Sequence, residues 1–134
     1  MSAARAFEPE GWPRPRGYSD AMAAEGRIVC VAGQVGWDPR TQRIVSPDFV
    51  AQTRRALENV VAALAAAGAG FTDVVRLTWY VTDRDAYLTH QQQVGAAYRE
   101  VCGRHYPAMS VVVVAALIEA GARVEIEATA VVPR

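Results

Sequence analysis

Two glutamates near the end of the chain have the residue type and spacing for acid–base chemistry. From Arg123 to Val132 polar and apolar residues alternate, which is typical of a strand with one face in the core. Glu125 and Glu127 therefore lie on the face opposite the core. A carboxylate in a partly dry cleft can position a water molecule and take its proton. The structural alternative is a carboxylate that is solvated or paired with Arg123 or Arg76, and what covers this second face decides between the two.

Four further residues are candidates for contact with a small molecule. The hydroxyl of Tyr18 can bind a substrate or a water molecule, or it can stay at the surface at the start of a strand. Gly33 permits a ligand to approach the backbone of its strand, or it marks a β-bulge. Gln92 is either a solvated helix residue or a ligand contact. Met109 either lines a pocket or fills a gap in the core.

No pattern in the chain is typical of a metal or redox site. His90 and His105 are not spaced with Cys, Asp or Glu as metal ligands are, so we expect no metal and no cofactor. Cys30 and Cys102 fall in a predicted strand and a predicted helix, without a CxxC motif. We interpret both as buried free thiols of a reducing compartment.

Strands and helices must position these candidates. Apolar runs and alternation predict strands over residues 27–33, 74–82, 110–115 and 123–132, with a weak edge strand over 18–24. The strand over 74–82 is expected to place Val75, Leu77, Trp79 and Val81 on one side. The last two strands are expected to be joined by a short turn at Gly121.

Two amphipathic helices are predicted, from Ser46 to about Ala67 and from about Thr89 to Cys102. Ser46 is the expected N-cap of the first, with a proline and an aspartate in the first turn, and Gly68 is its expected C-terminal cap. Four of its residues are expected to face water, namely Arg54, Arg55, Glu58 and Asn59. Residues 1–16, rich in proline and glycine, predict an irregular N-terminal arm.

The order β-β-α-β-α-β-β predicts one two-layer α+β domain over residues 1–134, with a sheet that carries helices on one face. The strand over 110–115 is apolar on both sides, so the other face of the sheet also needs a cover. Self-association in a closed symmetric oligomer is the economical cover.

Composition excludes several classes of protein. Fourteen basic and fourteen acidic residues cancel and no Lys/Arg run is present, which argues against a nucleic-acid partner. No apolar run approaches the length of a membrane span, and the N-terminal residues contain no apolar core of a secretory signal. We therefore expect a soluble cytoplasmic protein with no membrane partner.

An ordered set of short segments resembles the Rid (reactive intermediate deaminase) family, also called YjgF-like. No single segment is specific, but together they span nearly the whole chain in the order of the family. They are G-Y-S (17–19), V-A-G-Q (31–34), Q-T (52–53) with L-x-N (57–59) and L-x-x-x-G (64–68), D-V-V-R-L-T (73–78), Y-P-A (106–108) and V-E-I-E-A (124–128). The resemblance implies a chorismate-mutase-like fold, assembled as a homotrimer with the sheets packed inward and pockets in the clefts between subunits.

The resemblance also implies a reaction. The best-known members hydrolyse imines and enamines derived from amino acids to a keto acid and ammonia. Glu125 and Tyr18 match positions of the family's site, Gln92 is placed at its helix asparagine, and Ala32 stands where the family has serine. Met109 stands where those members have an arginine that clamps the substrate carboxylate.

Three hypotheses follow from this departure. The first is a deaminase in which Glu125 positions water in a pocket built from Tyr18, Gly33, Gln92 and Met109. The second is a deaminase for a larger or less polar imine, because methionine is apolar and uncharged. The third is a non-catalytic trimer that binds a small metabolite or a partner. Arg104 and Arg123 are possible substitutes for the missing arginine.

Overall fold

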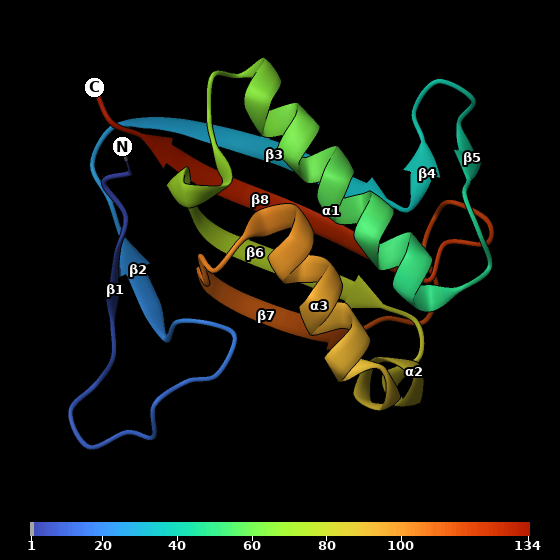
Figure 1. Cartoon of the computed structure of the whole chain (residues 1–134), viewed down its shortest axis with the longest axis horizontal. Helices are drawn as coiled ribbons and strands as arrows, with labels where there is room; N and C mark the ends of the chain where they lie inside the picture. The colour runs from blue at the N-terminus through green and yellow to red at the C-terminus, as the bar shows by residue number, and fades with distance from the viewer. Residues whose placement is uncertain (1) are drawn as a thin grey trace.

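A four-stranded mixed sheet is the centre of the structure, a computed structural model that describes residues 2–134 (Figure 1). The strands lie in the order β3 (Arg27–Val35), β8 (Val124–Val132), β6 (Val74–Val81) and β7 (Ala108–Val113). β6 and β7 run parallel, and the other two pairs are antiparallel. The last strand of the chain therefore lies inside the sheet, between two strands that precede it in sequence.

Helices cover one face of this sheet. The long helices α1 (Phe49–Ala66) and α3 (Gln91–Cys102) lie across it, and a short helix α2 (Arg84–Thr89) precedes α3 (Figure 1). The predicted α+β architecture with helices on one face is confirmed. The prediction of a single second helix is incomplete, because the separate short helix α2 forms directly before it and ends at Thr89, where that helix was expected to begin. Asp83 explains the difference, since its carboxylate accepts a hydrogen bond from the backbone N–H of Ala86 at 3.1 Å and caps α2.

The first helix begins two residues later than predicted. Asp48, not Ser46, is its N-cap, and the carboxylate of Asp48 accepts from the N–H of Ala51 at 2.8 Å. The hydroxyl of Ser46 instead accepts from the N–H of Asp48 at 3.0 Å and shapes the approach to the helix. At the other end Gly68 adopts a left-handed conformation, with φ +76°, close to the predicted end of the helix.

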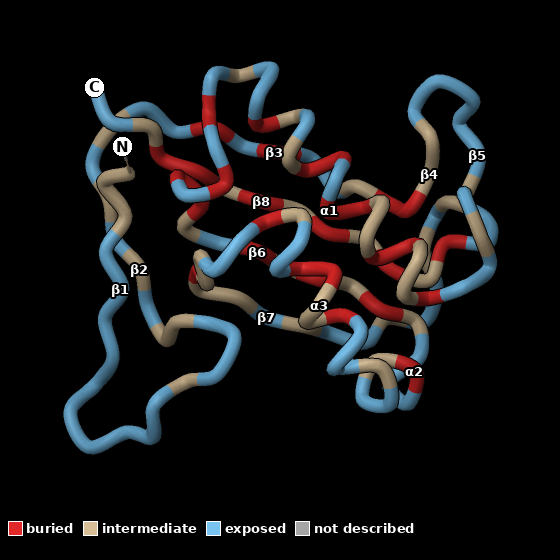
Figure 2. The backbone as a smooth tube through the Cα atoms, viewed as in Figure 1, coloured by how far each residue is buried: buried red, intermediate tan, exposed pale blue. Residues whose placement is uncertain are grey.

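The core lies between the helices and the covered face of the sheet (Figure 2). The predicted alternation of β8 is confirmed, because Val124, Ile126 and Ala130 are fully buried there. In β6 the prediction for Val75 is wrong. A register shift between Val74 and Arg76 places Val74 on the core side, so that it takes the position expected for Val75.

Asn59 was predicted to face water and is instead buried. Its side-chain amide donates hydrogen bonds to the carbonyl oxygens of Val35 at 3.1 Å and Trp37 at 2.9 Å. These carbonyls lie where the chain leaves β3 for the hairpin of β4 (Trp37–Asp38) and β5 (Arg43–Ile44). Periodicity alone assigns an asparagine to the solvent, whereas here its amide donates to the carbonyl of Val35 and shares that of Trp37 with the guanidinium of Arg55.

The N-terminal stretch is more ordered than predicted. Part of the expected irregular arm forms β1 (Arg5–Phe7), which pairs with β2 (Ala21–Ala23) in a separate two-stranded sheet. Ser19 ties this segment to the start of β7. Its N–H donates to the carbonyl of Pro107 at 3.0 Å, and its hydroxyl donates to the carbonyl of Tyr106 at 2.6 Å. The N-terminal segment is therefore attached to the start of the edge strand β7 by an isolated bridge between Ser19 and Ala108, while its own two strands form a separate sheet.

The two closing strands are not neighbours, because β6 lies between β7 and β8. The short turn expected between them is a longer connection over residues 114–123, which includes Gly121 with φ +82°. A parallel β6–β7 pair and a central β8 require this longer path. Side chains on the connection are largely exposed, and that of Ile118 is fully so.

Candidate functional site

The face of the sheet opposite the helices is open. Cys30 is exposed on it, so the prediction that both cysteines are buried is wrong for Cys30 and correct for Cys102. Ile28 and Val112 are also on this face, with 67% and 40% of their surface exposed. The chain by itself therefore leaves apolar residues and a thiol uncovered on the face that carries Glu125.

Glu125 lies against Gly33 on the open face. A Cβ atom added to Gly33 would come within 2.7 Å of Cδ of Glu125 and closer still to Oε2. The register of β3 against β8 also shifts between Val31 and Gln34, which is a bulge at this glycine. The bulge expected at Gly33 is therefore present, whereas contact of its backbone with a ligand stays a prediction. What approaches the backbone is the carboxylate of Glu125.

No arginine neutralises Glu125 in the part of the chain that the structure describes. The expected partner Arg123 instead pairs with Asp83 at 3.7 Å and lies over the ring of Phe49. Glu125 forms no ion pair with Arg76 within residues 2–134 either. The oxygens of a carboxylate without a cation partner remain able to accept hydrogen bonds from water.

The neighbours of Glu125 form a small polar cluster. Tyr80 lies directly opposite it on β6, and Glu127 is the next residue of β8 on the same face. Partial burial raises the pKa of Tyr80, and the carboxylates of Glu127 and Glu125 raise it further, whereas Arg76 acts in the opposite direction. The phenol therefore stays protonated and can donate a hydrogen bond near the carboxylates.

Met109 lies on the other face of the sheet. It is opposite Leu77 in the β6–β7 pair, and it lines a cavity of about 300 Å³ between the sheet and α3. It also packs against the hydrophobic core. Met109 therefore lines a cavity and packs against the core, and its contact with a substrate stays a prediction. Four aromatic residues, Trp79, Tyr87, Tyr98 and Tyr106, form part of the cavity wall.

Glu125 and Met109 are therefore not brought together within one chain. The register places Glu125 opposite Tyr80 and Met109 opposite Leu77, and these two residues of β6 face opposite sides of the sheet. The structure brings Gly33 and Glu125 together and separates both from Met109. A pocket that contains all three requires a second copy of the chain.

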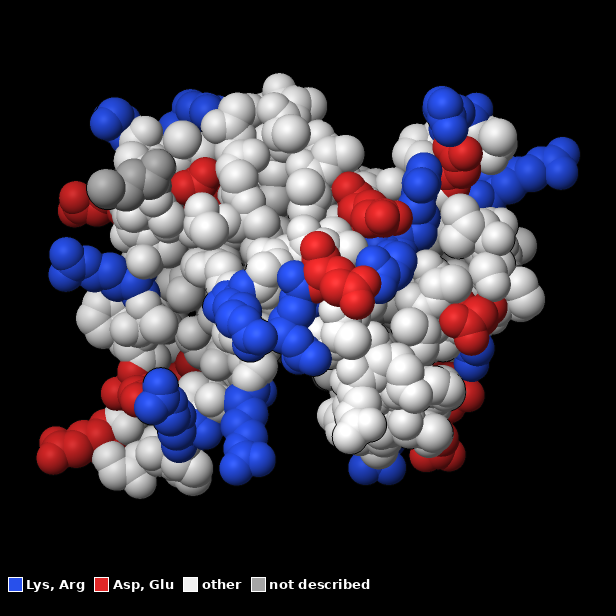
Figure 3. Space-filling model, viewed as in Figure 1, with Lys and Arg blue, Asp and Glu red and all other residues white. Residues whose placement is uncertain are grey.

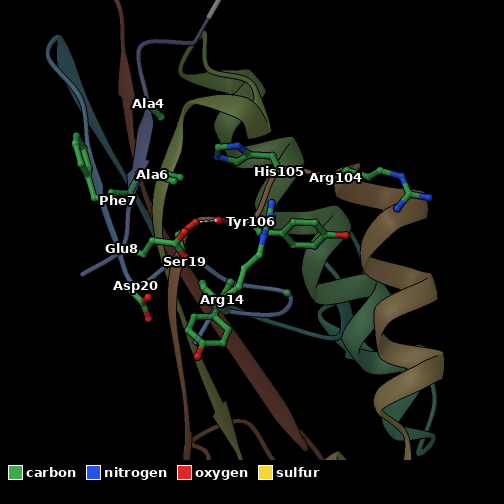
Figure 4. Close-up of a pocket in the computed structure, with 14 residues that line it drawn as sticks. Ala4, Ala6, Phe7, Glu8, Arg14, Ser19, Asp20, Arg104, His105 and Tyr106 are labelled. Atoms are coloured by element: carbon green, nitrogen blue, oxygen red, sulfur yellow. Dashed lines mark hydrogen bonds between the residues drawn. The ribbon is translucent and has the colours of Figure 1, made fainter. Parts of the chain in front are cut away.

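Tyr18 lines a different cavity, of about 510 Å³, between the N-terminal segment and residues 104–106 (Figure 4). Figure 4 shows Glu8 and Asp20 of the N-terminal segment on one side and His105 and Tyr106 on the other. His105 is fixed by a contact of 2.7 Å between its Nε2 and the carbonyl of Val74.

The prediction for Gln92 misses the cavity by one residue. Gln92 is exposed on α3, while Gln91 lines the cavity of Met109. Successive residues of an α-helix are rotated by about 100° about its axis, so neighbouring side chains point to different faces. Gln91, Val94, Gly95 and Tyr98 are spaced i, i+3, i+4 and i+7 and all line the cavity, so this helical spacing would have identified Gln91.

The described residues contain neither a metal-binding cluster nor a membrane-spanning helix. Within residues 2–134 no cluster of three or more His, Cys, Asp or Glu side chains could hold a metal ion. None of the helices described is both long enough and apolar enough to cross a bilayer.

Comparison with known proteins gives consistent matches. The sequence model of the family described as endoribonuclease L-PSP matches residues 13–132. Protein DfrA of Myxococcus xanthus is 38% identical over 96% of each chain. Human 2-iminobutanoate/2-iminopropanoate deaminase is 35% identical over 85% of this chain and 79% of its own.

A solved structure adds the three-dimensional match. The Rid family protein YyfB of Yersinia pestis superposes with a TM-score of 0.83 at 35% identity, over 97% of this chain and 99% of that one. The expected chorismate-mutase-like α+β fold is thereby confirmed. Since the family model covers most of the chain and relatives above 30% identity span it, the chain belongs to the Rid family, also called YjgF-like.

Proposed function

We propose that this protein hydrolyses imines or enamines derived from amino acids to a carbonyl compound and ammonia. One observation carries the proposal. Glu125 is held against Gly33 with no cation partner among the described residues, which is the arrangement a carboxylate needs to accept a proton from water. Relatives named as 2-iminobutanoate/2-iminopropanoate deaminases support the same class of reaction.

The reaction needs one base and one water molecule. Glu125 orients the water and takes a proton from it while the oxygen attacks the imine carbon. The nitrogen gains protons and leaves as ammonia, and the C=O bond forms as the C–N bond breaks. The protonated Tyr80, opposite Glu125 on β6, can donate a hydrogen bond to the water or to the developing charge.

We also propose that the working form is a homotrimer with its sites between subunits. The exposed Ile28 and Val112 on the open face favour a second copy as the cover of that face. Glu125 and Met109 lie on opposite faces of one sheet, so neighbouring copies are needed to unite them. The open face of the sheet is internal in such an assembly. We propose the cytoplasm as the location of this trimer.

Met109 sets the expected substrate range. An arginine at this position would bind a carboxylate through two parallel hydrogen bonds, and a methionine cannot. Its place in a cavity of about 300 Å³, which four aromatic side chains help to line, favours substrates with a larger apolar body over the smallest imino acids.

Imines generated in place by an amino-acid oxidase, from a panel of amino acids, test the proposal. The Glu125→Gln variant should lose about a hundredfold or more of the rate above the uncatalysed reaction, because it removes the base and keeps the size. Glu127→Gln is the matched control on the same strand and face, and it should retain most of the rate. Wild-type turnover that survives unchanged in Glu125→Gln would contradict the assignment of the base.

A trimer that binds a metabolite without turnover is the second candidate, favoured by the absence of the arginine at Met109. A ligand-induced rise in Tm without ammonia release would support it. The family's description as an endoribonuclease has little support in the charge of this chain. Fourteen basic and fourteen acidic residues cancel, and Figure 3 shows the two kinds interspersed over the helix-covered face.

A further inference from the structure

The cavity beside Met109 contains two positive charges and no negative one. Arg16 and Arg99 both line it, and no aspartate or glutamate of the described chain does. Arg16 reaches it from the loop between β1 and β2, and Arg99 reaches it from α3. A cavity with this lining attracts an anion.

Neither guanidinium is engaged elsewhere. Arg54 and Arg123 form ion pairs with Glu100 and Asp83, whereas Arg16 and Arg99 form none within residues 2–134. Arg104 and Arg123, the substitutes expected from the sequence, do not line this cavity. The structure thus replaces both expected cations with two that the sequence did not indicate.

Gly95 gives Arg99 its position. A Cβ atom on Gly95 would lie 3.2 Å from Nη1 of Arg99, so the guanidinium folds back over the space that the glycine leaves open. A glycine in the middle of a helix destabilises it relative to alanine. At this position the glycine allows a cation to lie close to the helix surface at the cavity.

A third donor at the cavity also has no acceptor. Trp79 lines the cavity, only 3% of its surface is exposed, and its indole N–H is buried without a hydrogen-bond partner in the described chain. Buried donors are nearly always paired, so an unpaired one adjoining a cavity indicates an acceptor that the chain does not supply.

We propose that Arg16 and Arg99 bind the carboxylate of a ligand whose body is aromatic or large and apolar. The guanidiniums supply the charge that Met109 lacks, and the stacked rings of Trp79, Tyr98 and Tyr106 form an aromatic wall against which the body of the ligand can pack. The inference rests on the proposed function for the identity of that ligand, a 2-imino acid with an aromatic side chain.

Binding of phenylpyruvate to the full chain, measured by calorimetry, tests this inference without turnover. Phenylpyruvate is the stable 2-oxo counterpart of such an imino acid. Arg16→Gln and Arg99→Gln should each weaken binding roughly tenfold, and the double variant about a hundredfold. The neutral amide of phenylpyruvate should bind wild type and double variant alike. Arg104→Gln, outside this cavity, is the matched control and should bind as wild type does.

The outcomes separate this inference from the proposed function, because imine hydrolysis is measured on the same proteins. Binding that depends on both arginines without any hydrolysis would support the carboxylate site and contradict the deaminase. Hydrolysis with binding unchanged in the double variant would overturn the carboxylate site and leave the deaminase intact. Failure of wild type to bind phenylpyruvate would also overturn it. Gly95→Ala, which crowds Arg99, should weaken binding about threefold while the helix becomes no less stable.

Discussion

The two faces of the central sheet differ in how far one chain explains them. On the covered face Leu77, Ile126 and Val124 are fully buried by the helices, and every one of them has an evident packing role. On the open face Ile28 and Cys30 are exposed, and Glu125 lies in a space that only a glycine permits. The packing of the covered face is completed by the helices of the same chain. The exposed apolar residues and the position of Glu125 on the open face have no such explanation within the chain.

This difference teaches where to look for function. Packing residues on the covered face stabilise the fold, and their loss should unfold it. Polar and apolar residues that lie together on an uncovered face, without pairing among themselves, indicate that something else contacts them. The proposals for Glu125 and for self-association both come from this second face.

The largest expected effect is on the covered face. Leu77→Ala should lower the free energy of unfolding by about 2–5 kcal/mol, because it leaves a cavity in a closely packed core. Leu88→Ala is the matched control, since Leu88 is half exposed on α2, and it should cost less than about 1 kcal/mol. Urea denaturation measures both. Equal losses in the free energy of unfolding for the two variants would contradict the distinction between the packed, covered face and the exposed residues.

The next effect concerns the open face. Ile28→Asp should prevent assembly. Burial of the Ile28 side chain in an interface would contribute about 1.5–3 kcal/mol per subunit, and the substitution places a charge there instead. Light scattering should then give the mass of a single chain, 14.5 kDa, with the far-ultraviolet spectrum unchanged. Leu88→Asp, on the helix layer, should leave the assembly as in wild type. A wild type that is itself a single chain would refute the proposed trimer.

The last comparison concerns the two cysteines, and its effect appears only at alkaline pH. Burial raises the pKa of Cys102 to about 12 from its ordinary 9, so the thiol stays neutral in the folded protein while it ionises in the unfolded one. Stability from this group is therefore complete below about pH 9 and is lost as the pH rises toward 12, by at most about 1.4 kcal/mol per pH unit. Burial also raises the pKa of Tyr98, which adds a similar loss above pH 10.

Denaturant titrations at several alkaline pH values measure this slope. Cys102→Ala should flatten it relative to wild type, whereas Cys30→Ser, on the exposed side, should not. An identical slope in all three proteins would show that the alkaline loss arises from other groups.

Much of the fold could be predicted from the sequence because its patterns are local. The alternation that places Glu125 and Ile126 on different faces of β8 follows from the two-residue period of a strand. The apolar face of α3 follows from the helical period. Competition between adjacent polar residues is harder to predict. Ser46 and Asp48 are both good caps, and the choice between them depends on the path of the preceding loop.

The candidate site was less predictable because it depends on register between strands. Sequence patterns give each strand two faces, but they do not say which face of one strand joins which face of another. Glu125 and Met109 were expected in one pocket between subunits. Pairing with β6 places them on opposite sides of a single sheet, so that pocket stays a prediction about neighbouring copies. Arg16 and Arg99 were missed because nothing local in the sequence indicates that a loop and a helix meet at one cavity.

The central position of β8 has a consequence for how the chain folds. β3 and β6 are made early, but neither can complete its pairing until residues 124–132 arrive between them. During synthesis both strands have an unpaired edge facing the gap, a state prone to pairing with other chains. The sheet therefore closes late and through contacts distant in sequence, and such topologies fold more slowly than those built from neighbouring segments.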